Sequence, residues 1–267
     1  MNKKIAVIGG GNLGISITQG LIADGFVKPE KITVTRRRLH LLKELREKGV
    51  AVDKNNVNAV KNSDIIIMVI KPYQMKDVLE EIKPVIDPKR QIVISAVTGF
   101  SIDEMKEIVG EDIPVFRVMP NTAIAIRESM TCIATTNGTQ DQIDTVTTIF
   151  DALGKSVVIS EELMEAATVL GACGIAYSLR FIRAATQGGI EIGFDAKTAE
   201  LIASQTVKGA ANLLLVGGNH PEREIDKVTT PQGCTIVGLN EMEHRGFSSS
   251  LIKGIRASFN KIAKMIH

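Results

Sequence analysis

The ten residues Ile5–Gly14, IAVIGGGNLG, constrain the fold more than any other part of the sequence. Four apolar residues of strand type lead into Gly9, Gly11 and Gly14, and a helical apolar pattern follows them. This spacing lets a strand-to-helix turn bring backbone N–H groups against a pyrophosphate at a helix N-terminus. The alternative is a glycine-rich turn without a ligand. We expect a dinucleotide here, bound by Gly9, Gly11, Asn12 and Leu13.

The end of the second predicted strand, Lys31–Thr35, indicates which dinucleotide binds. NAD-binding proteins place Asp or Glu about 20 residues beyond the glycine turn to bond the ribose 2′-hydroxyl, whereas a 2′-phosphate requires neutral or basic side chains. This strand is followed by Arg36, Arg37 and Arg38, with no carboxylate in reach. We expect Arg36 and Arg37 to contact a 2′-phosphate, and Arg38 to start the next helix in solvent. NADPH is therefore the expected cofactor, with NADH as a second option.

Apolar runs of strand length alternate with helical patterns through residues 1–159. The run Asp64–Ile70 is apolar almost throughout, as in strands buried on both faces of a parallel sheet. This alternation predicts a Rossmann-like, doubly wound α/β domain over residues 1–159, with ligands at the carboxyl edge of the sheet. Further strands are predicted at Gln91–Ala96, Ile113–Val118, Met130–Ala134 and Ser156–Ile159, and helices at Leu39–Lys48, Gln74–Ile82, Ser101–Ile108 and Gln140–Leu153. Further cofactor contacts are expected from Asn56, Lys71, Pro72 and Asn121.

Residues 160–267 have a helical pattern throughout and are predicted to form a second domain. One long helix is expected from Ser160 to Gly188, and further helices at Asp195–Val216, Thr235–Arg245 and Ser248–Ile266. The Asp195–Val216 helix is apolar around much of its circumference and must therefore be surrounded by protein. Because this half has few helices of its own to surround it, we expect an obligate homodimer with interleaved helical domains.

Composition and cysteine usage exclude several other classes. The net charge is +2 without a long basic block, which argues against nucleic acid or an anionic membrane as the main partner. The three cysteines and four histidines show neither disulfide nor metal-ligand spacing, so no metal is expected. The sequence starts with the first strand, lacks the pattern of a signal peptide and has no apolar run of bilayer-spanning length. We expect a cytoplasmic protein.

Four stretches together carry a resemblance: GGGNLG at the first turn, RVMPNT at Arg117–Thr122, VTTPQGCTIVGL at Val228–Leu239, and Gly189–Leu215. The chain resembles a pyrroline-5-carboxylate reductase, the last enzyme of proline synthesis, essentially from end to end. The resemblance implies a Rossmann-like domain followed by a helical dimerisation domain, often assembled into a ring of dimers. It also implies hydride transfer from NADPH to the C=N bond of 1-pyrroline-5-carboxylate, giving L-proline.

The resemblance also implies a substrate loop. In the family this loop is written SPGGTT or SPGGAT; it binds the substrate carboxylate through a hydroxyl and backbone N–H groups, and its last Thr meets the ring nitrogen. The matching residues here are Thr230–Thr235. Thr235 also lies at a predicted helix start, where free N–H groups favour an anion, and its alternative role is that of an N-cap alone. The expected substrate contacts are Thr230, Gly233, Cys234 and Thr235, with Thr235 as the catalytic residue.

The chain departs from the family pattern on the substrate side. Gln232 replaces a loop glycine, Cys234 replaces a small Thr or Ala, and the helix motif GSGPAY becomes ACGIAY, with Cys173 and Ile175 in place of Ser and Pro. Without the kinking proline we expect a straighter helix and a shifted pocket wall. Two alternatives stay open: a paralogue that reduces another cyclic imine, and a non-catalytic NADP-binding regulator. A β-hydroxyacid dehydrogenase is disfavoured because its helix lysine is missing between Ser160 and Asp195.

Overall fold

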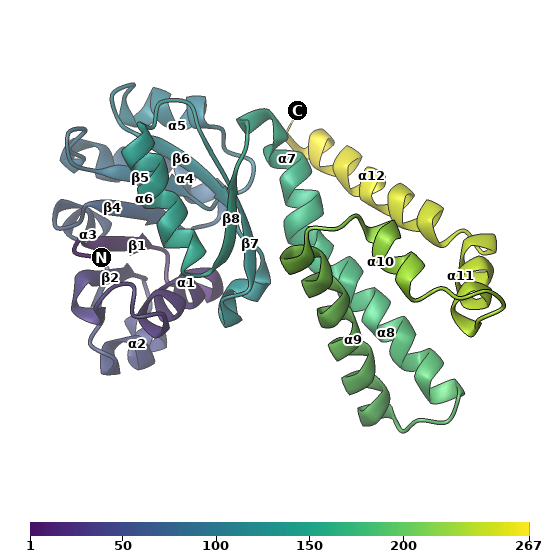
Figure 1. Ribbon diagram of the computed structural model, residues 1–267. Coiled ribbons are helices and arrows are strands. Elements are labelled where there is room, and N and C mark those ends of the chain that lie inside the picture. Colours follow the sequence, from purple (N-terminus) through teal and green to yellow (C-terminus); the bar gives the residue numbers. More distant parts are fainter. Residues whose placement is uncertain (267) are drawn as a thin grey trace. The chain divides into compact units, whose positions relative to one another are not determined.

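The computed structural model describes residues 1–266, and the side chains of residues 1–262 (Figure 1). The chain divides into two compact units. The first comprises Met1–Cys173 together with the end of the chain from Ile262, and the second comprises Gly174–Lys261. The first unit is a sheet covered by helices, and the second is helical.

One eight-stranded sheet with the strand order β3-β2-β1-β4-β5-β6-β7-β8 forms the centre of the first unit. All neighbouring strands are parallel except β6 and β7, which are antiparallel. The order reverses between β1 and β4, which is the point where doubly wound sheets bind their ligands. The predicted fold class is therefore confirmed. The strands are β1 Ile5–Ile8, β2 Ile32–Thr35, β3 Ala51–Asp53, β4 Ile65–Met68, β5 Ile92–Ser95, β6 Val115–Met119, β7 Ser129–Thr135 and β8 Gly154–Val158.

Two layers of helices bury the two faces of this sheet (Figure 1). Alternate residues of a strand point to opposite faces: Ile5 and Val7 pack in the core beneath α1, α2 and α6, whereas Ala6 and Ile8 pack beneath α3, α4 and α5. The helices are α1 Asn12–Ala23, α2 Lys43–Glu47, α3 Asn56–Lys61, α4 Met75–Ile82, α5 Ile102–Val109, α6 Gln140–Asp151 and α7 Met164–Ala167.

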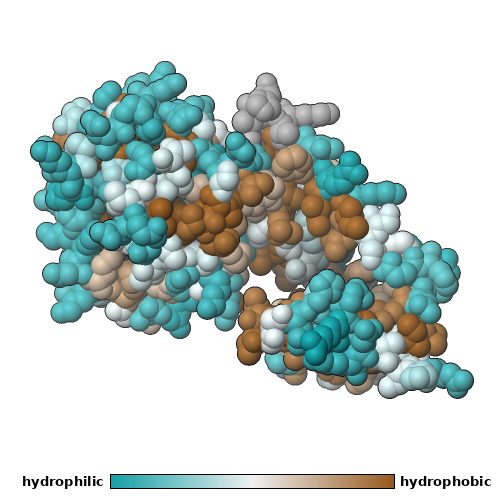
Figure 2. Space-filling model, turned by 45° about the horizontal axis from the view of Figure 1, so that its top comes forward, coloured by the Kyte–Doolittle hydropathy of each residue, from teal (hydrophilic) through white to brown (hydrophobic). Residues whose placement is uncertain are grey.

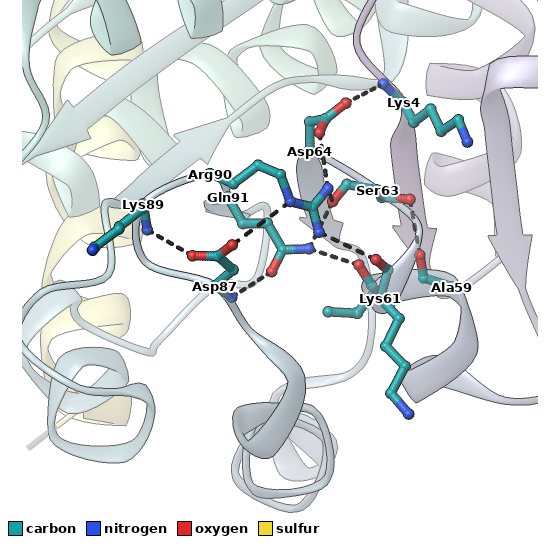
Figure 3. Close-up of polar contacts among 10 residues, drawn as sticks. Lys4, Ala59, Lys61, Ser63, Asp64, Asp87, Lys89, Arg90 and Gln91 are labelled. Carbon is teal, nitrogen blue, oxygen red and sulfur yellow. Dashed lines mark hydrogen bonds and ion pairs between the residues drawn. The ribbon is translucent and has the colours of Figure 1, made fainter.

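At the amino edge of the sheet, side chains donate hydrogen bonds to the backbone carbonyls at the end of α3 (Figure 3). Gln91 is 1% exposed; its Nε2 donates to the carbonyls of Val60 and Ser63, both at 2.6 Å, and its Oε1 accepts from the N–H of Asp87 at 2.8 Å. Arg90 donates to the Ser63 carbonyl and to the Asp64 carboxylate, both at 2.9 Å. This edge lies opposite the expected ligands, so the cluster serves stability.

The second unit is built from long helices. α8 Gly174–Glu191 packs along α9 Ala196–Gly217, and α10 Pro221–Lys227 and α11 Cys234–His244 follow. The last helix is α12 Phe247–Ile266, which belongs to this unit as far as Lys261. Tyr177 of α8 and Ser258 of α12 share a hydrogen bond of 2.7 Å between their hydroxyls, and the rings of Phe181 and Phe247 meet edge to face at 6.2 Å. These contacts tie α8 to α9 and α12 within this unit.

Many large apolar side chains of the helical unit are exposed, as the space-filling view shows (Figure 2). The buried residues of α9 are Ala199 and Ala203, whereas Leu215 and Val216 are 78% and 88% exposed. The helical stretch Glu161–Glu191 contains an 18-residue window of mean hydropathy 1.2, of which 6% is buried in the chain. By length and composition alone this stretch could cross a membrane, contrary to our expectation for this sequence. Another protein surface could cover the same residues equally well.

Several elements differ from the sequence-based expectation. The short strand β3 and the helices α3 and α10 were not predicted, because three to seven residues carry too little periodicity to be recognised. The predicted helix Leu39–Lys48 is a 3-10 turn, Leu39–Leu42, followed by the short α2.

Candidate functional site

The glycine turn after β1 requires glycine at Gly9 and Gly14 for the fold itself. Gly9 has a φ of +110°, and a Cβ there would lie 2.3 Å from the carbonyl oxygen of Val69. A Cβ at Gly14 would lie 2.2 Å from the carbonyl oxygen of Gly9. Both contacts are with backbone atoms, which cannot move aside as a flexible side chain can. These two glycines therefore set the close approach of α1 to the strand ends.

Gly11 has no such requirement. It is the exposed N-cap residue of α1 with a φ of −80°, and no described atom lies within 4 Å of the position of a Cβ. Within the described chain no side chain caps α1, so its first N–H groups have no side-chain partner, and Asn12 is exposed. Free N–H groups and the helix dipole make such a terminus attractive to an anion. Leu13 follows and is half-buried.

Arg36 is brought directly to this turn. Its Nη1 donates to the carbonyl of Gly10 at 2.7 Å, and the side chain is half-buried. A planar guanidinium held by one bond keeps further N–H donors for a phosphate. Arg37 and Arg38 are exposed, and the phosphate contact of Arg37 stays a prediction.

Asp53 is a feature of this edge that the sequence analysis missed. Thr35 at the end of β2 pairs in register with Asp53 at the end of β3. The Asp53 Oδ1 accepts from the N–H of Asn55 at 2.9 Å. We expected no carboxylate at this edge because β2 was the only strand predicted there. That expectation is wrong, because the unpredicted β3 places the Asp53 carboxylate beside the end of β2. A carboxylate at this position is the kind of acceptor that a ribose hydroxyl requires.

The remaining predicted cofactor residues lie along the same edge with different partners. Asn56 begins α3, and its Nδ2 donates to the Glu81 carboxylate of α4 at 2.9 Å. Lys71 and Pro72 follow β4 on an exposed turn in which the N–H of Lys71 donates to Gln74 Oε1 at 3.4 Å. Their contacts with a cofactor stay predictions.

Asn121 follows β6 and is buried, with 8% exposure. Its Oδ1 accepts from the N–H of Ala123 at 3.0 Å, and its Nδ2 donates to the carbonyl of Gly171 at 3.2 Å. The side chain thus joins the end of β6 to the helical stretch that follows β8. The second N–H of the amide and the remaining lone pair of Oδ1 are the groups available for the predicted cofactor contact.

Arg117 forms a buried ionic cluster at the centre of β6, which the sequence analysis also missed. Its side chain is 6% exposed and pairs with Glu161 at 2.8 Å and Glu165 at 3.5 Å. The Glu161 oxygen that meets Arg117 also accepts from the N–H of Ile102 at the start of α5, at 2.8 Å. One carboxylate therefore joins β6, α5 and the start of the α7 region. The sequence signal was an arginine inside the otherwise apolar strand VFRVM.

The helix expected from Ser160 to Gly188 is interrupted by a π-helix at Thr168–Cys173, between α7 and α8. Ile175 lies beyond this π-helix, in the first turn of α8, so the straighter helix expected from the missing proline stays a prediction. Thr168 lies at the start of the irregular stretch, and its hydroxyl donates to the carbonyl of Met164 at 2.8 Å, a contact that tends to bend helices. The extra residue per turn shifts the carbonyl partners, and the carbonyl of Gly171 accepts from Asn121.

The predicted substrate loop lies in the second unit as a tight turn leading into α11. The N–H of Gly233 donates to the carbonyl of Thr230 at 3.0 Å, and Gln232 takes the left-handed conformation with a φ of +60°. A Cβ at Gly233 would lie 2.5 Å from the hydroxyl oxygen of Thr230, so glycine places that hydroxyl at the helix start.

Gly233 is the N-cap residue of α11, and no described side chain caps this helix. The alternative role of Thr235 as an N-cap is therefore wrong. Cys234 and Thr235 are the first two helical residues, and their N–H groups belong to those that lack a partner within a helix. The turn brings together all four predicted substrate residues, Thr230, Gly233, Cys234 and Thr235.

Comparison with known proteins decides the family. The family described as pyrroline-5-carboxylate reductase dimerisation matches residues 161–265, and the family described as NADP oxidoreductase, coenzyme F420-dependent, matches residues 4–99. Pyrroline-5-carboxylate reductase 2 of Dictyostelium discoideum is 44% identical over 279 residues, which cover 98% of this chain and 93% of that protein. The chain belongs to the pyrroline-5-carboxylate reductase family.

Other members of the pyrroline-5-carboxylate reductase family agree. Pyrroline-5-carboxylate reductase 1 of Dictyostelium discoideum is 47% identical over 276 residues, and the chain spans half the length of that relative. The solved pyrroline-5-carboxylate reductase of Coxiella burnetii has a TM-score of 0.94 at 29% identity, with both chains fully covered. The Plasmodium falciparum pyrroline carboxylate reductase, solved with NADP bound, has a TM-score of 0.87 at 25% identity and covers 100% of this chain and 99% of its own. The resemblance inferred from the sequence is confirmed.

Proposed function

We propose that this chain transfers hydride from NADPH to the C=N bond of 1-pyrroline-5-carboxylate, giving L-proline. Membership of the pyrroline-5-carboxylate reductase family over nearly the whole chain carries this proposal. We assign residues 1–159 to dinucleotide binding and residues 160–267 to dimerisation and substrate binding.

The residues of the sheet edge fit NADP. The open N-terminus of α1 can receive the pyrophosphate over Gly11, where a Cβ would otherwise stand. The half-buried Arg36 has donors left for a 2′-phosphate beside the same turn. The bound cofactor supplies the hydride, and the protein supplies orientation and fixed dipoles. Asn12, Leu13, Arg37, Asn56, Lys71, Pro72 and Asn121 are the further proposed contacts.

The substrate loop supplies hydrogen-bond donors for the carboxylate and the ring nitrogen of a cyclic imino acid. The Thr230 hydroxyl and the free N–H groups at the start of α11 can hold the carboxylate, with Gly233 and Cys234 contributing backbone. Thr235 would align the ring nitrogen for attack at the adjacent carbon. An imine nitrogen can be protonated before reaction, so a strong general acid is not required. This suits a loop that contains no Asp, Glu, His or Lys.

The helical unit supports a homodimer. Side chains of α9 that a single chain leaves exposed include Leu201 at 69%, Leu213 at 56% and Val216 at 88%. Burying such surfaces is favourable by about 25 cal/mol per Å² of apolar area, and a second copy carries the same helices. We propose an obligate dimer, a larger ring of dimers, and a cytoplasmic protein without nucleic-acid or membrane partners.

Gln232 supports the alternative that this chain reduces a different cyclic imine. A non-glycine residue in the left-handed region is uncommon, and it places an exposed side chain beside the proposed carboxylate site. A neighbouring side chain of this size could select a different cyclic imine.

The test follows the absorbance of NADPH when the pure protein meets 1-pyrroline-5-carboxylate. We expect oxidation of NADPH with formation of proline. Oxidation by another cyclic imine alone would establish the paralogue, and NADPH binding without any turnover would establish the regulator.

Thr235→Ala tests the assignment of the loop. It should lower kcat with little change in NADPH affinity, because the residue is placed on the substrate and not on the cofactor. Thr229→Ala is the matched control, since the Thr229 hydroxyl is already bound to the carbonyl of Ile225 at 2.8 Å. Equal steady-state kinetics in wild type and Thr235→Ala would contradict the assignment.

A further inference from the structure

Arg117 places a buried positive charge inside the apolar strand β6. Removing an arginine from water is costly unless its partners are well placed, and apolar residues fill the neighbouring positions of β6. Its side chain is 6% exposed, while the Glu161 and Glu165 side chains that pair with it are 20% and 27% exposed. The two carboxylates come from the short helical turns that begin the 161–173 region. The cluster therefore ties this region to the sheet.

The region that Arg117 holds lies at the ligand edge. β6 runs parallel to β5, β4 and β1, so its carboxyl end is at the same edge as the glycine turn. In a doubly wound sheet each half binds one mononucleotide. Arg36 lies in the half that contains β1, β2 and β3, so we assign the adenosine phosphate to that half. The nicotinamide is then assigned to the half that contains β4, β5 and β6.

The π-helix Thr168–Cys173 occupies this second half. It contacts β6 and β7, and the carbonyl of Gly171 accepts from Asn121 at the end of β6. No described atom lies within 4 Å of a Cβ built on Gly171, so bare backbone faces open space there, as at Gly11. π-helices occur frequently at functional sites.

We propose that Arg117 is a positioning residue for hydride transfer, acting through Glu161 and Glu165 to hold the π-helix Thr168–Cys173 at the nicotinamide half of the sheet edge. Arg117 itself does not touch the nicotinamide. The inference rests on the proposed reductase activity. A displacement of the order of 1 Å at such a site can cost about 100-fold in rate, which explains why two ion pairs and the Asn121 bond hold one irregular helical turn.

The test compares Arg117→Met with Arg90→Met. Arg90 is the matched control, because it also binds a carboxylate and two backbone carbonyls, but at the amino edge of the sheet (Figure 3). Both variants should melt at lower temperature than wild type. For the folded enzyme we expect kcat/KM for 1-pyrroline-5-carboxylate to fall about 100-fold in Arg117→Met and to stay at the wild-type value in Arg90→Met. The Kd for NADPH should equal that of the wild type in both variants.

Two further readouts separate positioning from stability. With NADPH deuterated at the transferred position, the isotope effect on kcat/KM should rise in Arg117→Met, because hydride transfer becomes slower than the other steps. Hydrogen exchange of the amides of residues 168–173 should be faster in Arg117→Met and unchanged in Arg90→Met.

A milder variant covers the case in which Arg117→Met does not fold. Glu165→Gln leaves Arg117 paired with Glu161, and it should lower kcat/KM about 10-fold with the same change in hydrogen exchange. Arg117→Lys, which keeps the charge, should restore part of the activity that methionine removes. An active wild type with unchanged kcat/KM in Glu165→Gln and Arg117→Met would overturn the positioning role alone. A wild type inactive toward the imine would overturn the proposed function and this role together.

Discussion

Replacing Gly11 with alanine separates what the glycine turn needs for folding from what it needs for the cofactor. Gly11 has a φ of −80°, which alanine adopts freely, and no described atom lies within 4 Å of its Cβ position. A slightly poorer N-cap and a less flexible unfolded chain nearly cancel, so the free energy of unfolding should change by less than about 1 kcal/mol. The folded chain alone thus gives no reason for glycine at this position.

A bound pyrophosphate does give a reason, because the new methyl group would stand at the open N-terminus of α1. Forcing an extra methyl group into a close contact costs about 1–3 kcal/mol, which corresponds to a roughly 5- to 150-fold rise in the Kd for NADPH. The assay is a fluorescence titration with NADPH, with urea unfolding of the same samples without cofactor. An unchanged Kd in Gly11→Ala would refute the placement of the pyrophosphate.

Gly14→Ala is the matched comparison on the same turn. Its Cβ would lie 2.2 Å from the carbonyl oxygen of Gly9, so α1 must shift before any cofactor binds. We expect a loss of about 1–3 kcal/mol in the free energy of unfolding without NADPH. Equal stability of the two variants would contradict this division of roles between the glycines.

Three further predictions concern the two edges of the sheet. Arg36→Leu should raise the Kd for NADPH about 10- to 100-fold, as expected for the loss of a charge-assisted bond of roughly 1.5–3 kcal/mol, and should leave the Kd for NADH nearly unchanged; titration of both cofactors measures this. Gln91→Leu should lower the free energy of unfolding by about 1–3 kcal/mol, since the Val60 and Ser63 carbonyls lose their buried donor; the urea midpoint reports it. Burial disfavours the charge of Asp64, but the hydrogen bonds from the Lys4 N–H and Arg90 outweigh it and lower the pKa below its ordinary 3.8. This carboxylate therefore stabilises the fold above about pH 4 and loses that effect as the pH falls through its folded pKa, so Asp64→Asn should flatten the acid limb of a stability profile.

Local pattern was sufficient for most of the first unit. The apolar runs at Ile5–Ile8 and Ile65–Met68 are buried strands as predicted, because a central parallel strand needs apolar residues on both faces. The glycine turn was recognised because the spacing of its glycines is local in sequence, although the carbonyl that excludes a Cβ at Gly9 belongs to Val69 after β4.

Two of the missed site features depend on partners distant in sequence. The three residues of β3 show no pattern of their own, and Asp53 reaches the cofactor edge only through pairing with β2. Arg117 and Glu161 are 44 residues apart, and either charge alone resembles a solvated side chain. The π-helix was not predicted because helical periodicity distinguishes poorly between 3.6 residues per turn and a single wider turn.

The fate of the transferred hydride tests whether this chain reduces 1-pyrroline-5-carboxylate. The wild-type protein would be incubated with 1-pyrroline-5-carboxylate and NADPH deuterated at its transferable position, and the product analysed by mass spectrometry. We expect L-proline carrying one deuterium on the ring carbon that was double-bonded to nitrogen. The proposed hydride transfer would be wrong if the proline carried no deuterium, or if the deuterated NADPH bound at the glycine turn but was not oxidised.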